Sequence, residues 1–162
     1  MRFFTSEWAT GDDESDAVAN QQNFLNSLDP DDPVYSFATS VNLHDARLDR
    51  VVFDSATRHL KLLLLSGDLQ VGYWRTEISY ADAAVQGRDI LAAALDTRSA
   101  EVWYDEFYLA DNRMTHAFLL VPESLRGSVA QEFEITFTSF SYTQQPIEGR
   151  VLATADNISI WS

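Results

Sequence analysis

The sequence predicts an α+β domain that is mainly β, built as an antiparallel curved sheet or a two-sheet sandwich of six to seven strands with an N-terminal amphipathic helix. Three observations lead to this fold class. Apolar residues recur with a period of two from residue 42 onward, which is typical of strands. Short turn sequences separate the alternating segments. Most of the strands are joined by short turns, and no long helical crossovers, which parallel strands require, separate them.

Two parts of unequal charge are expected within a single domain of residues 1–162. Residues 1–41 form an acidic arm, and residues 42–162 form the antiparallel β core. Residues 1–33 carry eight acids and one base, which is half of the net charge of −14 in a fifth of the length. A segment of this composition favours contact with solvent over burial.

One helix is expected near residues 15–28 of the arm. Four apolar residues fall on one face at helical spacing, namely Val18, Phe24, Leu25 and Leu28. Pro30 and Pro33 follow, and both are typical of a helix end. This stripe should pack the helix against the rest of the chain.

The β core is expected to run through a series of hairpins. The predicted strands lie near residues 47–53, 59–65, 71–80, 101–109, 114–121, 132–142 and 157–161. The alternation changes phase near Ser139, which predicts a bulge or a sharp twist there. Residues 82–98 allow two interpretations, a short helix or a loop followed by an irregular strand.

Composition excludes several classes of function. The absence of Cys excludes disulfides, thiol nucleophiles and thiolate zinc sites. A net charge of −14 without a basic patch disfavours nucleic acid as a partner. No secretory signal or apolar run of bilayer length is present, so we expect a cytoplasmic protein without membrane contact. No cofactor and no bound metal are expected.

Four polar residues stand out as a candidate cluster: His44, Asp45, Glu106 and His116. His44 and Asp45 precede a strand, where a ring nitrogen of His44 could anchor the start of the strand and Asp45 could bind backbone N–H groups. His116 shares an apolar face with Met114, which favours a core histidine with a satisfied ring. If residues 110–112 form a short hairpin turn, Glu106 lies opposite His116 and the two would pair. Such a pair most often serves as a buried polar clasp and less often as an acid–base pair.

Aromatic residues form a second candidate site. Four of them fall on strands where they could face solvent, namely Trp74, Trp103, Tyr104 and Tyr108. Exposed Trp and Tyr on an acidic surface are typical of protein recognition. The competing interpretation is that these side chains fill the core.

Several segments resemble a group of small bacterial domains. Leu43-His44-Asp45-Ala46 before an alternating strand resembles a motif of uncharacterised bacterial families and of immunity proteins from polymorphic toxin systems. The opening Met1-Arg2-Phe3-Phe4-Thr5-Ser6-Glu7-Trp8 is similar to that of one such family. The segments at 104–107, 114–120 and 132–137 are similar to the later strands of the same group. The resemblance implies a non-catalytic domain that neutralises a partner protein.

Three functions follow as hypotheses. The first is a protein-binding domain of bacterial type, immunity-like, that engages a basic partner, because a strongly acidic protein associates faster with a basic one. The second is a metal-dependent enzyme that uses His44, His116 and Glu106. The third is a self-associating structural domain that pairs through its terminal strand.

Overall fold

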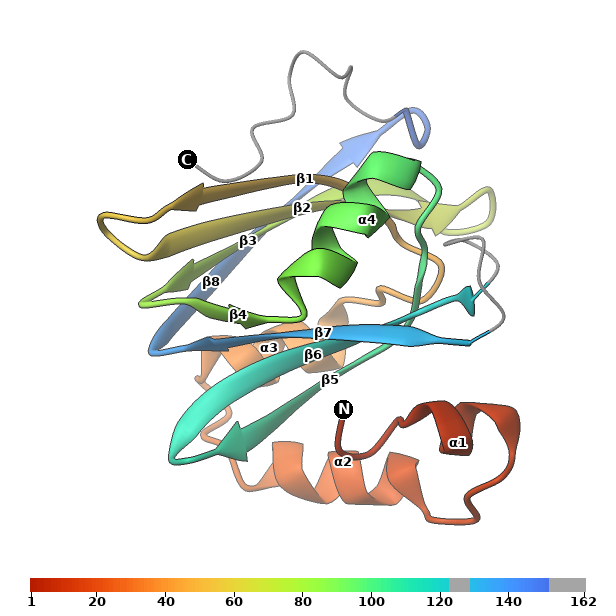
Figure 1. Ribbon diagram of the computed structural model, residues 1–162, viewed down its shortest axis with the longest axis vertical. Coiled ribbons are helices and arrows are strands. Elements are labelled where there is room, and N and C mark those ends of the chain that lie inside the picture. The colour runs from red at the N-terminus through yellow and green to blue at the C-terminus, as the bar shows by residue number, and fades with distance from the viewer. Residues whose placement is uncertain (123–128, 152–162) are drawn as a thin grey trace.

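Two antiparallel sheets of four strands enclose the core, which confirms the predicted fold class (Figure 1). The structure is a computed structural model that describes residues 1–122 and 129–151. One sheet has the strand order β1-β2-β3-β8 and the other the order β4-β7-β6-β5. The strands are β1 (Arg47–Asp54), β2 (His59–Asp68), β3 (Gly72–Ala81), β4 (Ala84–Gln86), β5 (Val102–Ala110), β6 (Arg113–Leu120), β7 (Gln131–Phe137) and β8 (Ser139–Ile147).

The two sheets meet at a corner where the predicted strand 132–142 divides into β7 and β8. β7 pairs with β4 and β6, whereas β8 pairs with β3 in the other sheet. At this corner the N–H group of Thr138 donates a hydrogen bond to the carbonyl of Ala81 (3.0 Å). The change of phase near Ser139 therefore marks the passage of the chain from one sheet to the other, rather than a bulge within one strand.

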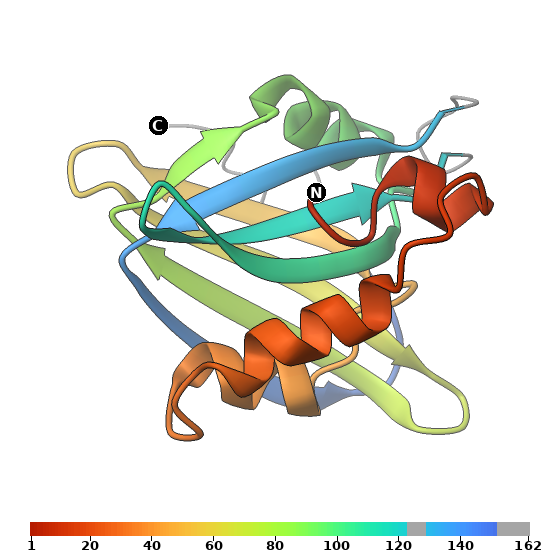
Figure 2. The same cartoon turned by 90° about the horizontal axis from the view of Figure 1, so that it is seen from below.

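Helices cover the two open sides of the sandwich (Figures 1 and 2). They are α1 (Ser6–Thr10), α2 (Ala17–Asn26), α3 (Pro33–Ser40) and α4 (Arg88–Thr97). α3 packs between β8 and β5, and α2 packs beside it on β5. α4 lies on the opposite side, between β1 and β7. Within the described ranges, no helix is both long and apolar enough to cross a membrane.

The expectation of a solvated arm with a single helix is wrong, because α3 enters the core. Phe37 of α3 is fully buried and packs edge-on against Phe107 and Phe140. Pro33 begins α3 instead of ending the preceding helix, and the Asp32 side chain accepts a hydrogen bond from the N–H of Val34. Proline suits the first turn of a helix because its missing N–H would have no partner there.

The predicted helix at 15–28 is present as α2, and three residues of the expected stripe pack on the core, since Leu25 is buried and Phe24 and Leu28 are half-buried against it. Ala17, Gln21 and Leu25 are buried, whereas Val18 is 61% exposed. The buried residues lie at i, i+4 and i+8, which places them along one side of the helix.

Residues 82–98 combine parts of both interpretations. The helical spacing is realised as α4, and the short strand β4 precedes it. β4 was not among the predicted strands, and together with the division of 132–142 it raises the number in the described part to eight. The predicted terminal strand at 157–161 lies outside the described residues.

Candidate functional site

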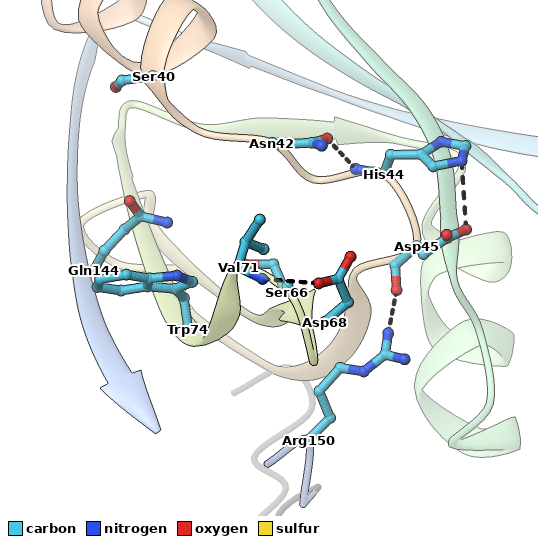
Figure 3. A pocket seen from close by; sticks show the side chains of 11 residues that line it. Ser40, Asn42, His44, Asp45, Ser66, Asp68, Val71, Trp74, Gln144 and Arg150 are labelled. Atoms are coloured by element: carbon cyan, nitrogen blue, oxygen red, sulfur yellow. Dashed lines mark hydrogen bonds and ion pairs between the residues drawn. The ribbon is translucent and has the colours of Figure 1, made fainter. Parts of the chain in front are cut away.

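A pocket of about 430 Å³ lies at one end of the sheet β1-β2-β3-β8 (Figure 3). Its walls come from the connection between α3 and β1, the β2–β3 hairpin, β8 and the segment that follows β8. Two predicted candidates of different kinds, His44 with Asp45 and the aromatic Trp74, line this same pocket.

The pocket continues the inner face of the first sheet. Pairs of residues along β2 and β3 change from apolar to polar toward this end: Leu62 faces Ile78, Leu64 faces Thr76, and Ser66 faces Trp74. Thr76 is fully buried and accepts a hydrogen bond from the Gln144 side chain of β8 (3.1 Å). The core therefore gives way here to a polar cavity with one aromatic wall.

The β2–β3 hairpin forms a well-defined tip beside the pocket. Oδ1 of Asp68 accepts hydrogen bonds from the N–H groups of Gln70 (2.7 Å) and Val71 (3.0 Å). These bonds are the largest causes that lower the pKa of Asp68, and Arg150 adds to them. Gly72 has a φ of 85°, which closes a three-residue loop without the steric penalty that a side chain would bring.

The hairpin tip exposes apolar side chains to solvent. Leu69 is 90% exposed and Val71 is 68% exposed. Val71 also lines the pocket beside Trp74. We call Leu69, Val71 and Trp74 the apolar rim of the pocket. Apolar side chains held on a rigid tip at the mouth of a cavity are typical of a binding surface.

His44 and Asp45 form the opposite wall. Nδ1 of His44 lies 2.6 Å from the carbonyl oxygen of Trp103, so the ring anchors the start of β1 to the start of β5 and the prediction for His44 is confirmed. Asp45 has a φ of 61° and its carboxylate lies 3.6 Å from Nε2 of His44. The backbone N–H bonds expected for the Asp45 side chain do not form among the described residues; its main-chain carbonyl accepts from Arg150 instead.

Arg150 brings a cation to the edge of the pocket (Figure 3). Its Nη1 donates a hydrogen bond to the main-chain carbonyl of Asp45 (2.6 Å). Its guanidinium carbon lies 5.9 Å from the ring centre of Tyr73. Arg150 therefore links the segment after β8 to the wall that precedes β1.

His116 occupies the centre of the core, as predicted, and is fully buried. Nδ1 of His116 lies 2.8 Å from the hydroxyl of Tyr80, and Nε2 lies 2.9 Å from the Asp105 carboxylate. Burial lowers the pKa of His116, although Asp105 opposes this effect. The neutral ring therefore donates from Nε2 to Asp105 and accepts from Tyr80 at Nδ1. Its ring also stacks on Phe107 at 3.9 Å.

The predicted pair of Glu106 with His116 is wrong. The hairpin turn contains two residues, Asp111 and Asn112, with φ values of 49° and 60°. This turn places His116 opposite Phe107 and Glu106 opposite Ala117. A turn one residue shorter than assumed moves Glu106 to the other face of the sheet, because side chains alternate along a strand.

Glu106 instead holds the N-terminal segment. It is 1% exposed and its carboxylate accepts hydrogen bonds from the N–H groups of Arg2, Phe3 (2.9 Å) and Phe4 (2.7 Å). Three backbone donors satisfy this buried charge, so its role is to bind the first residues to the sheet.

The structure does not bring the proposed metal ligands together. His116 lies inside the core, Glu106 lies on the outer face of its sheet, and His44 lies at the pocket. Across residues 1–122 and 129–151, no group of three or more His, Asp or Glu side chains is placed to hold a metal ion. The metal-dependent enzyme therefore lacks the constellation on which it was based.

The four candidate aromatics occupy three separate environments. Trp74 lines the pocket. Trp103 and Tyr104 stack on each other at 5.7 Å, because an irregularity in β5 places these neighbours side by side, and Tyr104 also contacts Phe4. Tyr108 is only 7% exposed and donates a hydrogen bond to Glu134 (2.6 Å). Trp74 is the only one of the four that lines the pocket.

Sequence reasoning did not identify Asp68, Gln144 or Arg150 as site residues. Asp68 was visible only as part of a turn sequence, although its place before a strand containing Trp74 was a usable signal. Gln144 and Arg150 reach the pocket through the pairing of β8 with β3, which no local pattern encodes.

Comparisons with protein-family models, with curated proteins and with solved structures give no match for this chain.

Proposed function

We propose that this chain is a non-catalytic protein-binding domain that engages a basic partner through the apolar rim of the pocket. The observation that carries the proposal is the exposure of Leu69 and Val71 on a tip that hydrogen bonds to Asp68 hold in place. A pre-organised surface loses little conformational entropy when it binds.

Charge favours a basic partner. The chain carries 25 acids against 11 bases, and Asp45 and Asp68 line the pocket beside the rim. Long-range attraction between opposite charges raises the rate of association and disfavours acidic competitors. A contact that combines an apolar rim with carboxylates selects a partner that presents both apolar and cationic side chains.

An immunity-like role in bacteria, implied by the resemblance of residues 43–46 and of the later strands, is one specific form of this proposal. This specific form of the proposal also includes a cytoplasmic location. Self-association is the alternative, and the experiment below separates it from binding to a different protein.

Site-specific photo-crosslinking in the organism that encodes the chain tests the proposal. A photoreactive amino acid replaces Leu69 at the rim, and in a control it replaces Val18 on α2, which is also exposed (61%) but lies away from the pocket. We expect the rim position to capture one basic protein, identified by mass spectrometry, that the control position does not capture.

Two further measurements sharpen the result. The Val71→Asp variant should abolish the crosslink, whereas Val18→Asp, which adds the same charge elsewhere, should preserve it. Complex formation should weaken at an ionic strength of about 1 M, where the Debye length falls to about 3 Å. Capture of a second copy of this chain, of an acidic protein, or of the same proteins from both positions would contradict the proposal.

A further inference from the structure

The pocket presents hydrogen-bond acceptors to a cation. Oδ1 of Asp68 holds the hairpin turn, while its Oδ2 has no hydrogen-bond partner among the described residues. Asp45 lines the same cavity, with its carboxylate 3.6 Å from Nε2 of His44 and its main-chain carbonyl bound by Arg150. A planar donor with several N–H groups can satisfy carboxylate and carbonyl acceptors at the same time.

A guanidinium group already lies at one side of this cavity. Arg150 has five N–H donors, and among the described residues they make a single hydrogen bond, to the carbonyl of Asp45 (2.6 Å). Arg150 also lies after β8 instead of within that strand. It is thus a cation of suitable chemistry that the pocket holds by few contacts.

Aromatic rings complete the chemistry of the site. Tyr73 lies under the guanidinium group of Arg150, and Trp74 forms the wall at the other side of the pocket (Figure 3). Guanidinium groups stack on aromatic faces, whereas the ammonium group of lysine has no planar face for such stacking. The combination favours arginine over lysine.

We infer that this pocket binds the guanidinium group of an arginine side chain that a partner protein presents, and that Arg150 competes for the same acceptors from within the chain. The inference rests on the proposed function and adds the chemical class of the group that the partner inserts. While Arg150 is bound, a fraction of the molecules is closed to the partner, and the apparent affinity falls by that fraction.

A titration with N-acetyl-arginine amide tests the inference directly. The readout is the nuclear magnetic resonance signal of the Trp74 indole N–H group, which a Trp74→Phe variant assigns. We expect a saturable shift with a Kd of about 1 mM, typical of a small ligand with few contacts. The matched citrulline amide has nearly the same shape but no charge, and it should leave the signal in place. The lysine amide should bind more weakly than the arginine amide.

Variants of the pocket separate its two parts. Asp68→Asn keeps the turn acceptor but removes the charge, and should weaken binding about tenfold. The control is Asp54→Asn, because Asp54 holds the β1–β2 turn in the same way, through the N–H groups of Ala56 and Thr57. This control should bind like the unaltered chain. Arg150→Gln should tighten binding about three- to tenfold by removing the competitor.

The outcomes test the arginine pocket, the competition by Arg150 and the proposed function separately. Equal binding of the citrulline amide, an absence of binding to both the unaltered chain and Arg150→Gln, or equal weakening by Asp54→Asn would overturn the arginine pocket. Unchanged affinity in Arg150→Gln would overturn the competition. Failure of the Leu69 crosslink would overturn the proposed function, and the amide titration would not change with it.

Discussion

Two carboxylate-lined regions of this molecule differ in what the chain itself places against them: one holds the N-terminal segment, and the other holds a single guanidinium group. On the outer face of the sheet β4-β7-β6-β5, Glu106 and Glu134 lie on either side of the fully buried Ala117. The N-terminal segment lies against this face (Figure 2), and the Met1 ammonium group is 2.7 Å from Glu134. At the pocket, Asp68 and Asp45 meet one loosely held guanidinium group.

The two regions differ in how many donors of the chain their carboxylates already bind. We call the region of Glu106 and Glu134 the saturated region, because each of these carboxylates binds donors of the N-terminal segment. Both carboxylate oxygens of Glu106 accept backbone N–H groups, and Oε1 of Glu134 accepts from the Met1 ammonium group and from Tyr108. Internal hydrogen bonds of this kind serve stability, because a buried acceptor without a partner costs free energy. At the pocket, Oδ2 of Asp68 has no hydrogen-bond partner among the described residues and lies beside exposed apolar side chains, and such a region can gain free energy from a partner.

The largest expected effect on stability concerns the β2–β3 hairpin beside the pocket. A Cβ atom at Gly67 would lie 2.0 Å from the main-chain oxygen of Gly72, and Gly67 has a φ of 88°. Gly67→Ala should therefore destabilise the protein by about 3 kcal/mol or more in urea unfolding. Gly72→Ala is the matched control: its φ is 85° but nothing lies within 4 Å of the added atom, so backbone strain alone should cost about 1–2 kcal/mol. Equal losses in the two variants would show that the tip tolerates displacement and is not the rigid element that the pocket requires.

A smaller but still large effect is expected at the saturated region. Glu106→Gln replaces one acceptor oxygen with an NH₂ group that faces the N–H groups of residues 2–4. It should cost about 2–3 kcal/mol in urea unfolding, because buried donors lose their acceptor. Hydrogen exchange at Arg2, Phe3 and Phe4 should become faster. Asp68→Asn makes the same carboxyl-to-amide change at the pocket and should leave the unfolding midpoint nearly unchanged. A similar loss in both variants would contradict the contrast between the regions.

Much of the fold could be predicted because its signals are local. The period of two and the turn sequences identify the long strands, and α2 lies within the predicted range. The role of α3 was not predictable in this way. The helix begins at Pro33 and has eight residues, and so short a segment shows too few repeats of an apolar pattern to indicate that Phe37 enters the core. The division of 132–142 between two sheets depends on which strands pair, and alternation alone shows only the change of phase.

The candidate site could be predicted in part for the same reason. His44, Asp45 and Trp74 stood out by residue type and local position, and they do line one pocket. Arg150 and Gln144 join them only through the return of β8 along β3. The partner of Glu106 was missed because one residue in the length of a turn decides which face of the sheet a side chain occupies.

The smallest expected effect is a dependence of stability on pH at the saturated region. Burial by itself would raise the pKa of Glu134, but hydrogen bonds from the Met1 ammonium group and from Tyr108 outweigh it and lower this pKa below its ordinary value of 4.5. As the pH falls through 4.5, the unfolded chain therefore takes up a proton at Glu134 before the folded chain does. The stabilisation from Glu134 is complete above pH 4.5 and is lost as the pH falls through the folded pKa.

Urea unfolding of Glu134→Gln over a series of pH values measures this contribution. The variant should be less stable than the unaltered chain at pH 7, and the difference should shrink as the pH falls below 4.5. Glu132 is the control, because it also contacts the Met1 ammonium group (3.1 Å) but is 47% exposed. Solvent screens such a pair, so Glu132→Gln should change the pH profile less than Glu134→Gln. If the two pH profiles coincide, the buried hydrogen bond of Glu134 contributes no more than the exposed ion pair of Glu132. That result would contradict the difference between the saturated region and the pocket.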